Sequence, residues 1–287
     1  MIKTNQSKLP IVSVLGEVSS PMQRIPYRTG FDGVSRTVVG TGGIVYNARV
    51  GDSAMGWVGD HVEPGVSTKN KDEKANGGYN TFACVGNVAH VVSGDAKGAK
   101  GFVTGTHGGI EHVIIDFEPE VLDKLTIGDK VQVRACGQGM EIEGCPGVKC
   151  MNLDPNLVLK MGIREGEGGV LEVPVAAIAP PELMGSGIGA ATAQRGDYDI
   201  TTQDAEALRE HGLDKLRFGD IVAVRDRSSF YGRSYRRGAL EIGVITHSDS
   251  KLAGHGPGVT TLLTANRGEI KPVIAPDANI AHYLGIR

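Results

Sequence analysis

The sequence predicts a mainly β protein with minor α content, built from β-barrel-like modules that contain an internally duplicated turn-strand unit. Three observations lead to this fold class. The 287 residues include 42 Gly but only 6 Phe, 7 Tyr and 1 Trp, a composition typical of tight turns between short strands. Val and Ile run between the glycines in short segments, as expected of buried or half-buried strands. Finally, one segment of the chain occurs twice.

The repeated segment covers residues 122–135 (LDKLTIGDKVQVRA) and 213–226 (LDKLRFGDIVAVRD), with nine of fourteen positions identical. Each copy is typical of a helix end, a Gly-Asp turn and a Val-x-Val strand. In such a turn the Gly takes a positive φ and the Asp side chain accepts hydrogen bonds from nearby amides. The two copies are therefore predicted to form barrel corners, and the seam between like units is a place where a pocket can form.

The remaining elements are predicted from local patterns along the chain. Strands are predicted in residues 8–20, 33–50 and 81–117, and the polar stretch 68–79 is predicted to be a loop. Helices are predicted in residues 119–125, 155–161, 180–184 and 202–211. The last of these segments is the clearest, with Thr201 or Thr202 as its N-cap.

A chain of this length can hold two hydrophobic cores. A Gly- and Pro-rich tract, GEGGVLEVPVAAIAPPELMGSGIG, joins two β-rich halves that each carry one repeat copy. The sequence therefore predicts an N-terminal domain over residues 1–150 and a C-terminal domain over residues 151–287.

Composition and motifs also exclude several classes of partner. Charged residues make up 22% of the chain and the net charge is −3, so no nucleic-acid partner is expected. Neither a signal peptide nor a run of 18 apolar residues is present, so we expect a cytoplasmic protein without a membrane partner. No P-loop or dinucleotide fingerprint occurs, so no nucleotide cofactor is expected. Apolar strands and Gly-rich loops make a homo-oligomer the expected assembly.

Polar residues that could take part in catalysis or ligand binding gather in three Gly-rich segments, which hold five of the eight histidines. Glycine lets the backbone approach a ligand closely, and its conformational cost marks such loops as binding loops. We therefore expect segments 51–67, 105–117 and 247–261 to converge on one concave site that binds a small molecule. The candidate residues of these segments are Asp60, His61, Glu63, His107, Glu111, His112, His247, Asp249 and His255.

The first interpretation of this site is a divalent metal centre, with Zn, Mn or Mg as the ion. His247 and Asp249 stand two positions apart, which places both side chains on one face of a strand. They form the predicted ligand set together with His255 and with His61 or Asp60. Glu63 or Glu111 is the candidate general base for a metal-bound water. A site of three thiolates from Cys136, Cys145 and Cys150 is an alternative that their spacing supports less well.

A second interpretation needs no metal. His107 then acts as the acid or base, and the amides of Gly108 and Gly109 form an oxyanion cradle. In either case an arginine is expected to bind an anionic substrate. The candidates are Arg36, a lone charge in an apolar strand, and Arg233, in an Arg- and Tyr-rich hairpin suited to a carboxylate.

Three long motifs also resemble a family of prokaryotic proteins catalogued as a domain of unknown function. They are GVSRTVVGTGGIVYNARVGDSAMGWVGDHVEPGVS, FVTGTHGGIEHVIIDF and GALEIGVITHSDSKLAGHGPGVTTLLT, in this order along nearly the whole chain. The resemblance implies a β-rich protein with barrel-like modules, and it supplies no catalytic residues.

These residues support two function hypotheses. The first is an enzyme, a metal-assisted hydrolase or lyase acting on a polar, anionic amide or cyclic substrate. The second is a non-catalytic protein that binds a small molecule or forms a homo-oligomeric assembly through the same loops. Metal content distinguishes the metal-assisted enzyme from the other possibilities.

Overall fold

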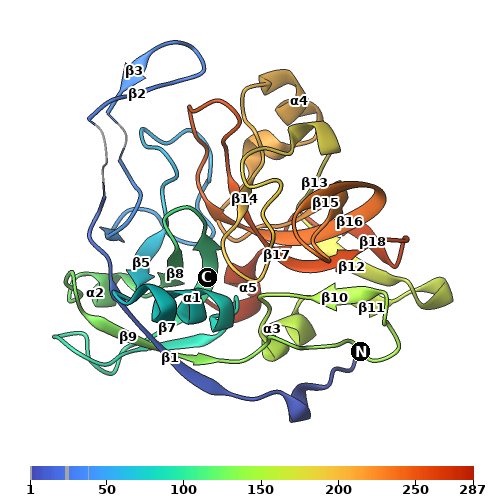
Figure 1. Cartoon of the computed structure of the whole chain (residues 1–287), viewed down its shortest axis with the longest axis horizontal. Coiled ribbons are helices and arrows are strands. Elements are labelled where there is room, and N and C mark those ends of the chain that lie inside the picture. Colours follow the sequence, from blue (N-terminus) through green and yellow to red (C-terminus); the bar gives the residue numbers. More distant parts are fainter. Residues whose placement is uncertain (1, 23–25, 38) are drawn as a thin grey trace.

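The structure is a computed structural model that describes residues 2–22, 26–37 and 39–287. Its N-terminal half forms a closed, entirely antiparallel barrel of six strands, which confirms the predicted fold class (Figure 1). The barrel closes because the last strand, β5, pairs with both β8 and β1. In the order of pairing the strands are β1 (Val12–Val18), β9 (Lys130–Ala135), β6 (Val88–Val91), β7 (Lys100–His107), β8 (His112–Asp116) and β5 (Gly65–Lys69), with β4 (Ile44–Val45) added to β5 outside the ring.

Alternating side chains fill the barrel. Along β9 the residues are exposed and buried in turn, so that Val131, Val133 and Ala135 face the core. Helix α1 (Glu73–Phe82) covers the barrel beside β1, where a side chain on Gly16 would collide with the ring of Tyr79. The predicted loop in this region was therefore wrong in part. The helix forms because Asp72 caps its first turn and because Asn76, Tyr79 and Asn80 are buried along it.

The C-terminal half contains a larger open sheet and a smaller one. The larger sheet consists of β10 (Val148–Cys150), β17 (Gly258–Ala265), β16 (Ser234–His247), β15 (Ile221–Ser228) and β13 (Ala177–Ala179), with β14 (Tyr198–Asp199) paired to β17. The smaller sheet consists of β11 (Arg164–Glu165), β12 (Leu171–Val175) and β18 (Ile270–Ile274). Strands β2 (Arg28–Thr29) and β3 (Ser35–Arg36) form a hairpin that projects from the body (Figure 1).

The other helices are short. Three of the four predicted helical segments begin with an α-helix or contain one, and the remaining segment, 180–184, contains a 3₁₀ turn. Asp204, rather than Thr201 or Thr202, caps α4. The α-helices are α2 (Pro119–Leu122), α3 (Pro155–Lys160), α4 (Ala205–Glu210) and α5 (Ile280–Leu284), and the 3₁₀ turns are η1 (Gln6–Lys8), η2 (Glu167–Gly169), η3 (Pro181–Leu183) and η4 (Leu213–Lys215).

The two repeat copies adopt the same turn before their strands. Gly128 has φ +92° and Gly219 has φ +85°. Asp129 accepts a hydrogen bond from the amide of the residue three positions earlier at 2.9 Å, and Asp220 does the same at 2.8 Å. The copies differ in the sheets that their strands join, because β9 enters the closed barrel whereas β15 enters the open sheet. The duplicated unit is thus the same local turn, which precedes a strand of the barrel in one copy and a strand of the open sheet in the other.

The two halves share hydrophobic cores. One core combines Ala48, Ala54 and Val62 with apolar residues of β13, β15 and β17. Strand β10, which ends at the predicted domain boundary of residue 150, pairs with β17. The two halves therefore pack together as one body. The division into residues 1–150 and 151–287 stays a prediction.

The site lies where the end of β7 packs against β16 and β17. A side chain on Gly105 would collide with Thr246, so the two backbones approach closely there. Thr106 donates its backbone N–H to the Thr260 hydroxyl at 3.1 Å, and that hydroxyl donates to the Thr106 carbonyl at 3.2 Å. This contact brings together the residues that come directly after Thr106 and Thr246, namely His107 and His247.

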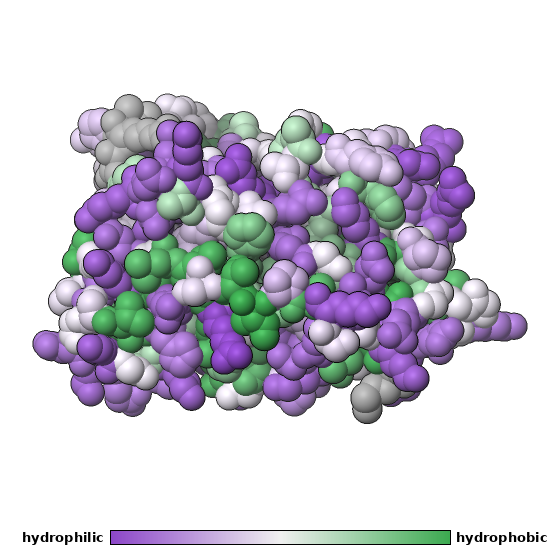
Figure 2. All heavy atoms as spheres, turned by 60° about the horizontal axis from the view of Figure 1, so that its bottom comes forward, coloured by the Kyte–Doolittle hydropathy of each residue, from purple (hydrophilic) through white to green (hydrophobic). Residues whose placement is uncertain are grey.

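The face that carries β1 and α1 is mostly hydrophilic, with apolar residues scattered on it (Figure 2). Val12, Leu15 and Phe82 are among the exposed large apolar side chains of these two elements. Among the described residues, no helix has the length and apolar character that crossing a membrane requires.

Substitution of the two turn glycines tests the equivalence of the repeat copies. Gly128→Ala should lower the free energy of unfolding by about 1 kcal/mol, because Ala is strained at this φ although its Cβ would meet open space. Gly219→Ala should cost about 1–3 kcal/mol more, because its Cβ would lie 2.5 Å from Val50 Cγ1. Urea denaturation measures both values.

The control is Gly78→Ala in α1, where the nearest atom would be 3.9 Å away and where Ala should be neutral or stabilising by about 0.5–1 kcal/mol. Equal costs at positions 128 and 219 would contradict the packing assigned to the second copy.

Candidate functional site

Five histidines and four carboxylates gather at the junction between the barrel and the larger sheet. The residues come from the ends of β7, β8, β14 and β16 and from the loops 59–63 and 248–257. All three Gly-rich segments singled out in the sequence contribute to this cluster. The members are His61, His107, His112, His247, His255, Asp60, Glu63, Asp197 and Asp199.

Three of the imidazoles are oriented in the same way. The Nδ1 of His61 lies 2.9 Å from Asp60 Oδ2, the Nδ1 of His107 lies 2.5 Å from Glu63 Oε1, and the Nδ1 of His247 lies 3.0 Å from the carbonyl of Ser248. Carboxylate and carbonyl oxygens only accept hydrogen bonds, so in the neutral form of each ring the proton is on Nδ1. The lone pair of each neutral ring is therefore on Nε2.

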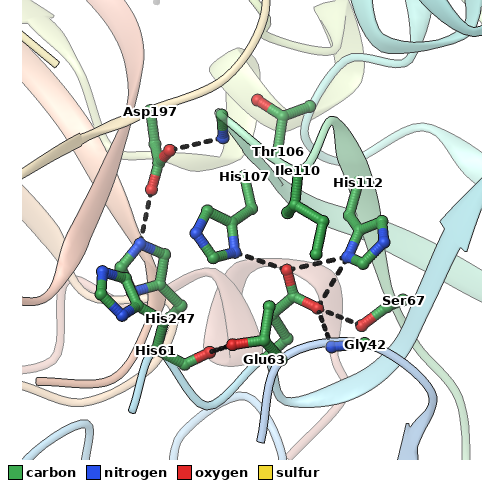
Figure 3. Close-up of polar contacts among 12 residues, drawn as sticks. Gly42, His61, Glu63, Ser67, Thr106, His107, Ile110, His112, Asp197 and His247 are labelled. Atoms are coloured by element: carbon green, nitrogen blue, oxygen red, sulfur yellow. Dashed lines mark hydrogen bonds and ion pairs between the residues drawn. The ribbon is translucent and has the colours of Figure 1, made fainter. Parts of the chain in front are cut away.

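One nitrogen of each of these rings lies close to those of the other two. His61, His107 and His247 each offer one ligand atom, and these atoms all lie within 4.8 Å of one another. Their ring centroids are 4.3 Å apart for His107 and His247 and 4.8 Å apart for His61 and His247 (Figure 3). The three nitrogens are therefore close enough together to hold one metal ion.

A second group adjoins the first. The His255 Nδ1 lies 2.9 Å from Asp199 Oδ2 and 3.1 Å from the Nε2 of His61, and that Nε2 lies 3.5 Å from the same carboxylate oxygen. The side chain of His255 is 33% exposed, whereas those of His61 and Asp199 are buried. This group of two histidines and one carboxylate thus has one edge open to solvent.

Asp197 and His247 form the deepest part of the cluster. Asp197 Oδ2 and His247 Nε2 are 2.7 Å apart and form an ion pair when the ring is protonated, although neither atom meets the geometry of a hydrogen bond with the described residues. Both side chains are almost fully buried, and a buried charge is costly unless it is both paired and hydrogen-bonded. Gly258 packs against this pair so closely that any side chain there would collide with both atoms.

Glu63 holds two of the rings in place. Its side chain is fully buried, and its oxygens accept hydrogen bonds from His107, His112, Ser67 and the amide of Gly42 (Figure 3). Burial alone would raise its pKa, but the charges of His112 and His107 and their hydrogen bonds lower it well below the ordinary 4.5. Glu63 therefore positions histidines and is not free to act as the general base that the sequence suggested.

The other acids are also held in the ionised form. Burial opposes ionisation, but hydrogen bonds from His61 and Ser250 lower the pKa of Asp60 to about 2. The pKa of Asp197 and that of Asp199 are lowered below the usual value, because nearby histidines outweigh the effect of burial. Burial alone would lower the pKa of His61, yet Asp199 and Asp60 raise it to about 10. A cation that binds His61 Nε2 must therefore displace a proton.

Two adjoining hollows lead to the cluster. They have volumes of about 440 and 570 Å³ and share His61, His107, Gly108, Gly109 and His255 in their walls. The first is also lined by Arg28 and Asp60. The second is also lined by Glu111, Arg195, Asp197, Asp199 and Arg233.

Glu111 is the predicted base that the structure leaves available. It has φ +60°, and its carbonyl accepts hydrogen bonds from Asn76 and Asn80. Its Oε2 is buried and makes no hydrogen bond with the described residues. Glu111 thus lines the second hollow, while its Oε2 is shielded from solvent.

The remaining candidate residues do not lie where their predicted roles would require. Asp249 accepts a hydrogen bond from the Gly56 amide and lies outside the ligand groups that the described residues form, because β16 ends at His247 and the alternation of faces stops there. Arg36 pairs with Asp32 within the β2–β3 hairpin and lines neither hollow. The three cysteines also lie outside these ligand groups.

The predicted oxyanion cradle is only partly available. The Gly108 amide already donates a hydrogen bond to Asp197 Oδ1 at 2.7 Å. Arg233 lines the second hollow, but its guanidinium donates to the carbonyls of Arg195 and Asp197 and so holds that loop in place. Burial lowers the pKa of Arg233. Gly109 remains in the walls of both hollows.

Sequence reasoning missed Asp197 and Asp199. The two acids stand at alternate positions in GDYDI, where an extended chain directs both to one face. The same spacing signal was applied to His247 and Asp249 but not to this pair. The buried ring of Tyr198 between them packs beneath the Arg227 guanidinium, whose Cζ is 3.2 Å from the ring centroid, and this anchors the strand.

Comparison with known proteins agrees with the resemblance found in the sequence. Two family models match, the N-terminal part of a domain of unknown function (DUF4438) over residues 27–159 and its C-terminal part over residues 160–284. A solved structure titled "Crystal structure of TM1086" is similar, with 46% identity, a TM-score of 0.94 and 98% of each chain covered. No curated protein matches the chain.

Glu63→Gln tests the ionisation of the buried acid. The folded pKa of Glu63 lies below its unfolded value of 4.5, so the unfolded state alone takes up this proton as the pH falls through 4.5. The stabilisation is thus present above this pH and is lost below it. In metal-free protein, the free energy of unfolding should fall with decreasing pH more steeply in the wild type, by up to about 1.4 kcal/mol per pH unit. Urea denaturation at several pH values below 5 measures both slopes, and equal slopes would show that Glu63 is not ionised.

Proposed function

The chain belongs to the DUF4438 family, and we propose that it is a metal-dependent enzyme, a hydrolase or lyase that acts on a small anionic amide or cyclic molecule. The observation that carries the proposal is the arrangement of His61, His107 and His247. Each ring has its Nδ1 held by an acceptor of the protein, and each offers one ligand nitrogen that lies within 4.8 Å of those of the other two. Histidines that bind metal ions are oriented in this way by carboxylates and carbonyls.

The buried pair of Asp197 and His247 supports the same proposal. Their facing atoms form a buried contact of 2.7 Å that lacks the geometry of a hydrogen bond, and a cation close to both atoms would satisfy them when the ring of His247 is neutral. The ionised acids Asp60, Glu63, Asp197 and Asp199 give the site the negative charge that a divalent cation compensates.

The donor atoms favour a transition metal among the three ions considered. The ligand groups combine imidazole nitrogens with carboxylate oxygens. Mg²⁺ prefers oxygen donors, whereas Zn²⁺ and Mn²⁺ accept this mixed set. We therefore expect Zn²⁺ or Mn²⁺ at the site, and neither ion requires a nucleotide cofactor.

His61, His107 and His255 line both hollows, so a metal ion bound to them would act on a molecule in either hollow. A bound metal ion lowers the pKa of a coordinated water and polarises a substrate carbonyl. In this proposal Glu111, which lines the second hollow, takes a proton from that water or from the substrate. His255 occupies the open edge, where both hollows meet.

Arginines at the hollows favour an anionic substrate. Arg28 lines the first hollow and Arg195 the second, and both side chains are exposed enough to meet a ligand. The volumes of about 440 and 570 Å³ suit a small molecule. A homo-oligomer remains part of the proposal, because apolar side chains of β1 and α1 are exposed.

Metal content is the first test. Protein purified without an affinity tag should contain a transition metal, and His247→Ala should weaken its binding by at least about a hundredfold, because even substitutions behind the ligands cost about 10–100-fold. Elemental analysis and competition with a chromogenic chelator measure content and affinity. His211→Ala, at an exposed histidine after α4, is the matched control and should bind metal normally. Wild-type protein that neither contains nor takes up metal would contradict the proposal.

His255→Ala separates catalysis from stability. The variant should lose turnover of small anionic amides or cyclic esters by at least about a hundredfold. Its free energy of unfolding in the metal-free form should change by no more than about 1 kcal/mol, because the side chain is partly exposed. A variant that loses several kcal/mol of stability yet binds metal and ligand normally would show that His255 is structural. Metal binding without turnover of any such compound would instead favour the non-catalytic binding protein.

A further inference from the structure

We propose that the site holds two metal ions bridged by the carboxylate of Asp199, an inference that rests on the proposed metal-dependent function. The donor residues are more numerous than one catalytic ion needs. A catalytic zinc ion takes about three protein ligands and keeps a position for water. Six side chains occur in the ligand groups of the described residues: His61, His107, His247, His255, Asp197 and Asp199.

One ion alone does not account for the spread of these donors. Opposite ligands of a single octahedral ion are about 4.2 Å apart, twice a bond of about 2.1 Å. All six donors of one ion would therefore fall within the 4.8 Å that defines each group. Yet no group of the described residues combines His107 with His255 or with Asp199. The six donors consequently divide between two neighbouring positions.

The first position lies among His61, His255 and Asp199. Their donor atoms form a triangle with sides of 2.9, 3.1 and 3.5 Å. Adjacent ligands on an ion with bonds of about 2.1 Å are separated by about 3.0–3.4 Å, so the triangle fits one ion. Two histidines and one carboxylate on one face leave further positions for water or substrate.

The second position lies among His247, Asp197 and Asp199, beside His107. The His247 Nε2 is 2.7 Å from Asp197 Oδ2 and 3.6 Å from Asp199 Oδ1. The His107 ring centroid is 4.3 Å from that of His247. This position contains the two buried atoms that make no hydrogen bond with the described residues, which is the independent sign that a cation belongs there.

Asp199 faces both positions with different oxygens. Its Oδ1 is directed to His247, whereas its Oδ2 is directed to His255 and His61. A carboxylate that uses one oxygen for each of two ions holds them about 3.5–4 Å apart, the separation found in two-metal hydrolytic sites. In this arrangement one ion can bind an anionic oxygen of the substrate while the other binds water.

Counting bound ions tests the inference and distinguishes it from the proposed function. Chelator-treated wild-type chain should bind two Mn²⁺ ions, measured by isothermal titration and elemental analysis. The electron paramagnetic resonance spectrum of the loaded protein should show an exchange-coupled pair. Asp199→Asn should abolish the coupling, and His255→Ala should reduce the count from two to one. His211→Ala is the control and should retain two coupled ions.

Each alternative result has a separate meaning. One bound ion in the wild type, or two ions without coupling, would overturn the bridged pair and leave the proposed metal-dependent function intact. No bound ion with Mn²⁺ or Zn²⁺ would overturn both. A coupled pair that persists in Asp199→Asn would show that another group forms the bridge and would also overturn the assignment.

Discussion

The close contact between Gly105 in β7 and Thr246 in β16 is the constraint on which the site depends. No side chain larger than hydrogen fits at position 105, because a Cβ there would lie 2.1 Å from Thr246 Cγ2. Hydrogen bonds between Thr106 and Thr260 fix the same junction. His107 and His247 each come directly after it in sequence, so the packing of the barrel on the larger sheet determines the distance between their rings. Gly258 in the neighbouring strand β17 has the same effect, because the lack of a side chain there leaves room for Asp197 beside His247.

Burial of so many titratable groups opposes folding unless each is paired. Removing a carboxylate from water costs several kcal/mol, which is offset only by close partners. Asp60, Glu63 and Asp199 each have imidazole partners within hydrogen-bond distance, and their pKa values stay low. Asp197 and His247 differ in that their contact of 2.7 Å is an ion pair without the geometry of a hydrogen bond. Under the proposed function, a bound cation would contact both atoms of this pair, and metal binding would then stabilise the site.

The sequence predicted the fold class and the corners more reliably than the roles of single residues. The Gly-Asp turns of both repeat copies form because their chemistry is local, with the Asp side chain bonded three residues back. The role of Asp249 depended on a strand continuing past His247, and the register of β16 and β17 shifts just before that residue. Arg36 found its partner four residues away, in Asp32. The spacing of Asp197 and Asp199 indicates that they share a face, but they reach the site through the long-range pairing of β14 with β17, which their local spacing does not indicate.

The three histidines are proposed to present Nε2 to a metal while the protein holds Nδ1, and the function depends on this arrangement. Crystals soaked with Zn²⁺ and measured on both sides of the zinc absorption edge test it directly. We predict an anomalous peak about 2.1 Å from the Nε2 of at least two of His61, His107 and His247, with Asp60 and Glu63 still bonded to Nδ1. A peak bonded to Nδ1 instead, or zinc bound only at residues outside this junction, would contradict the proposal.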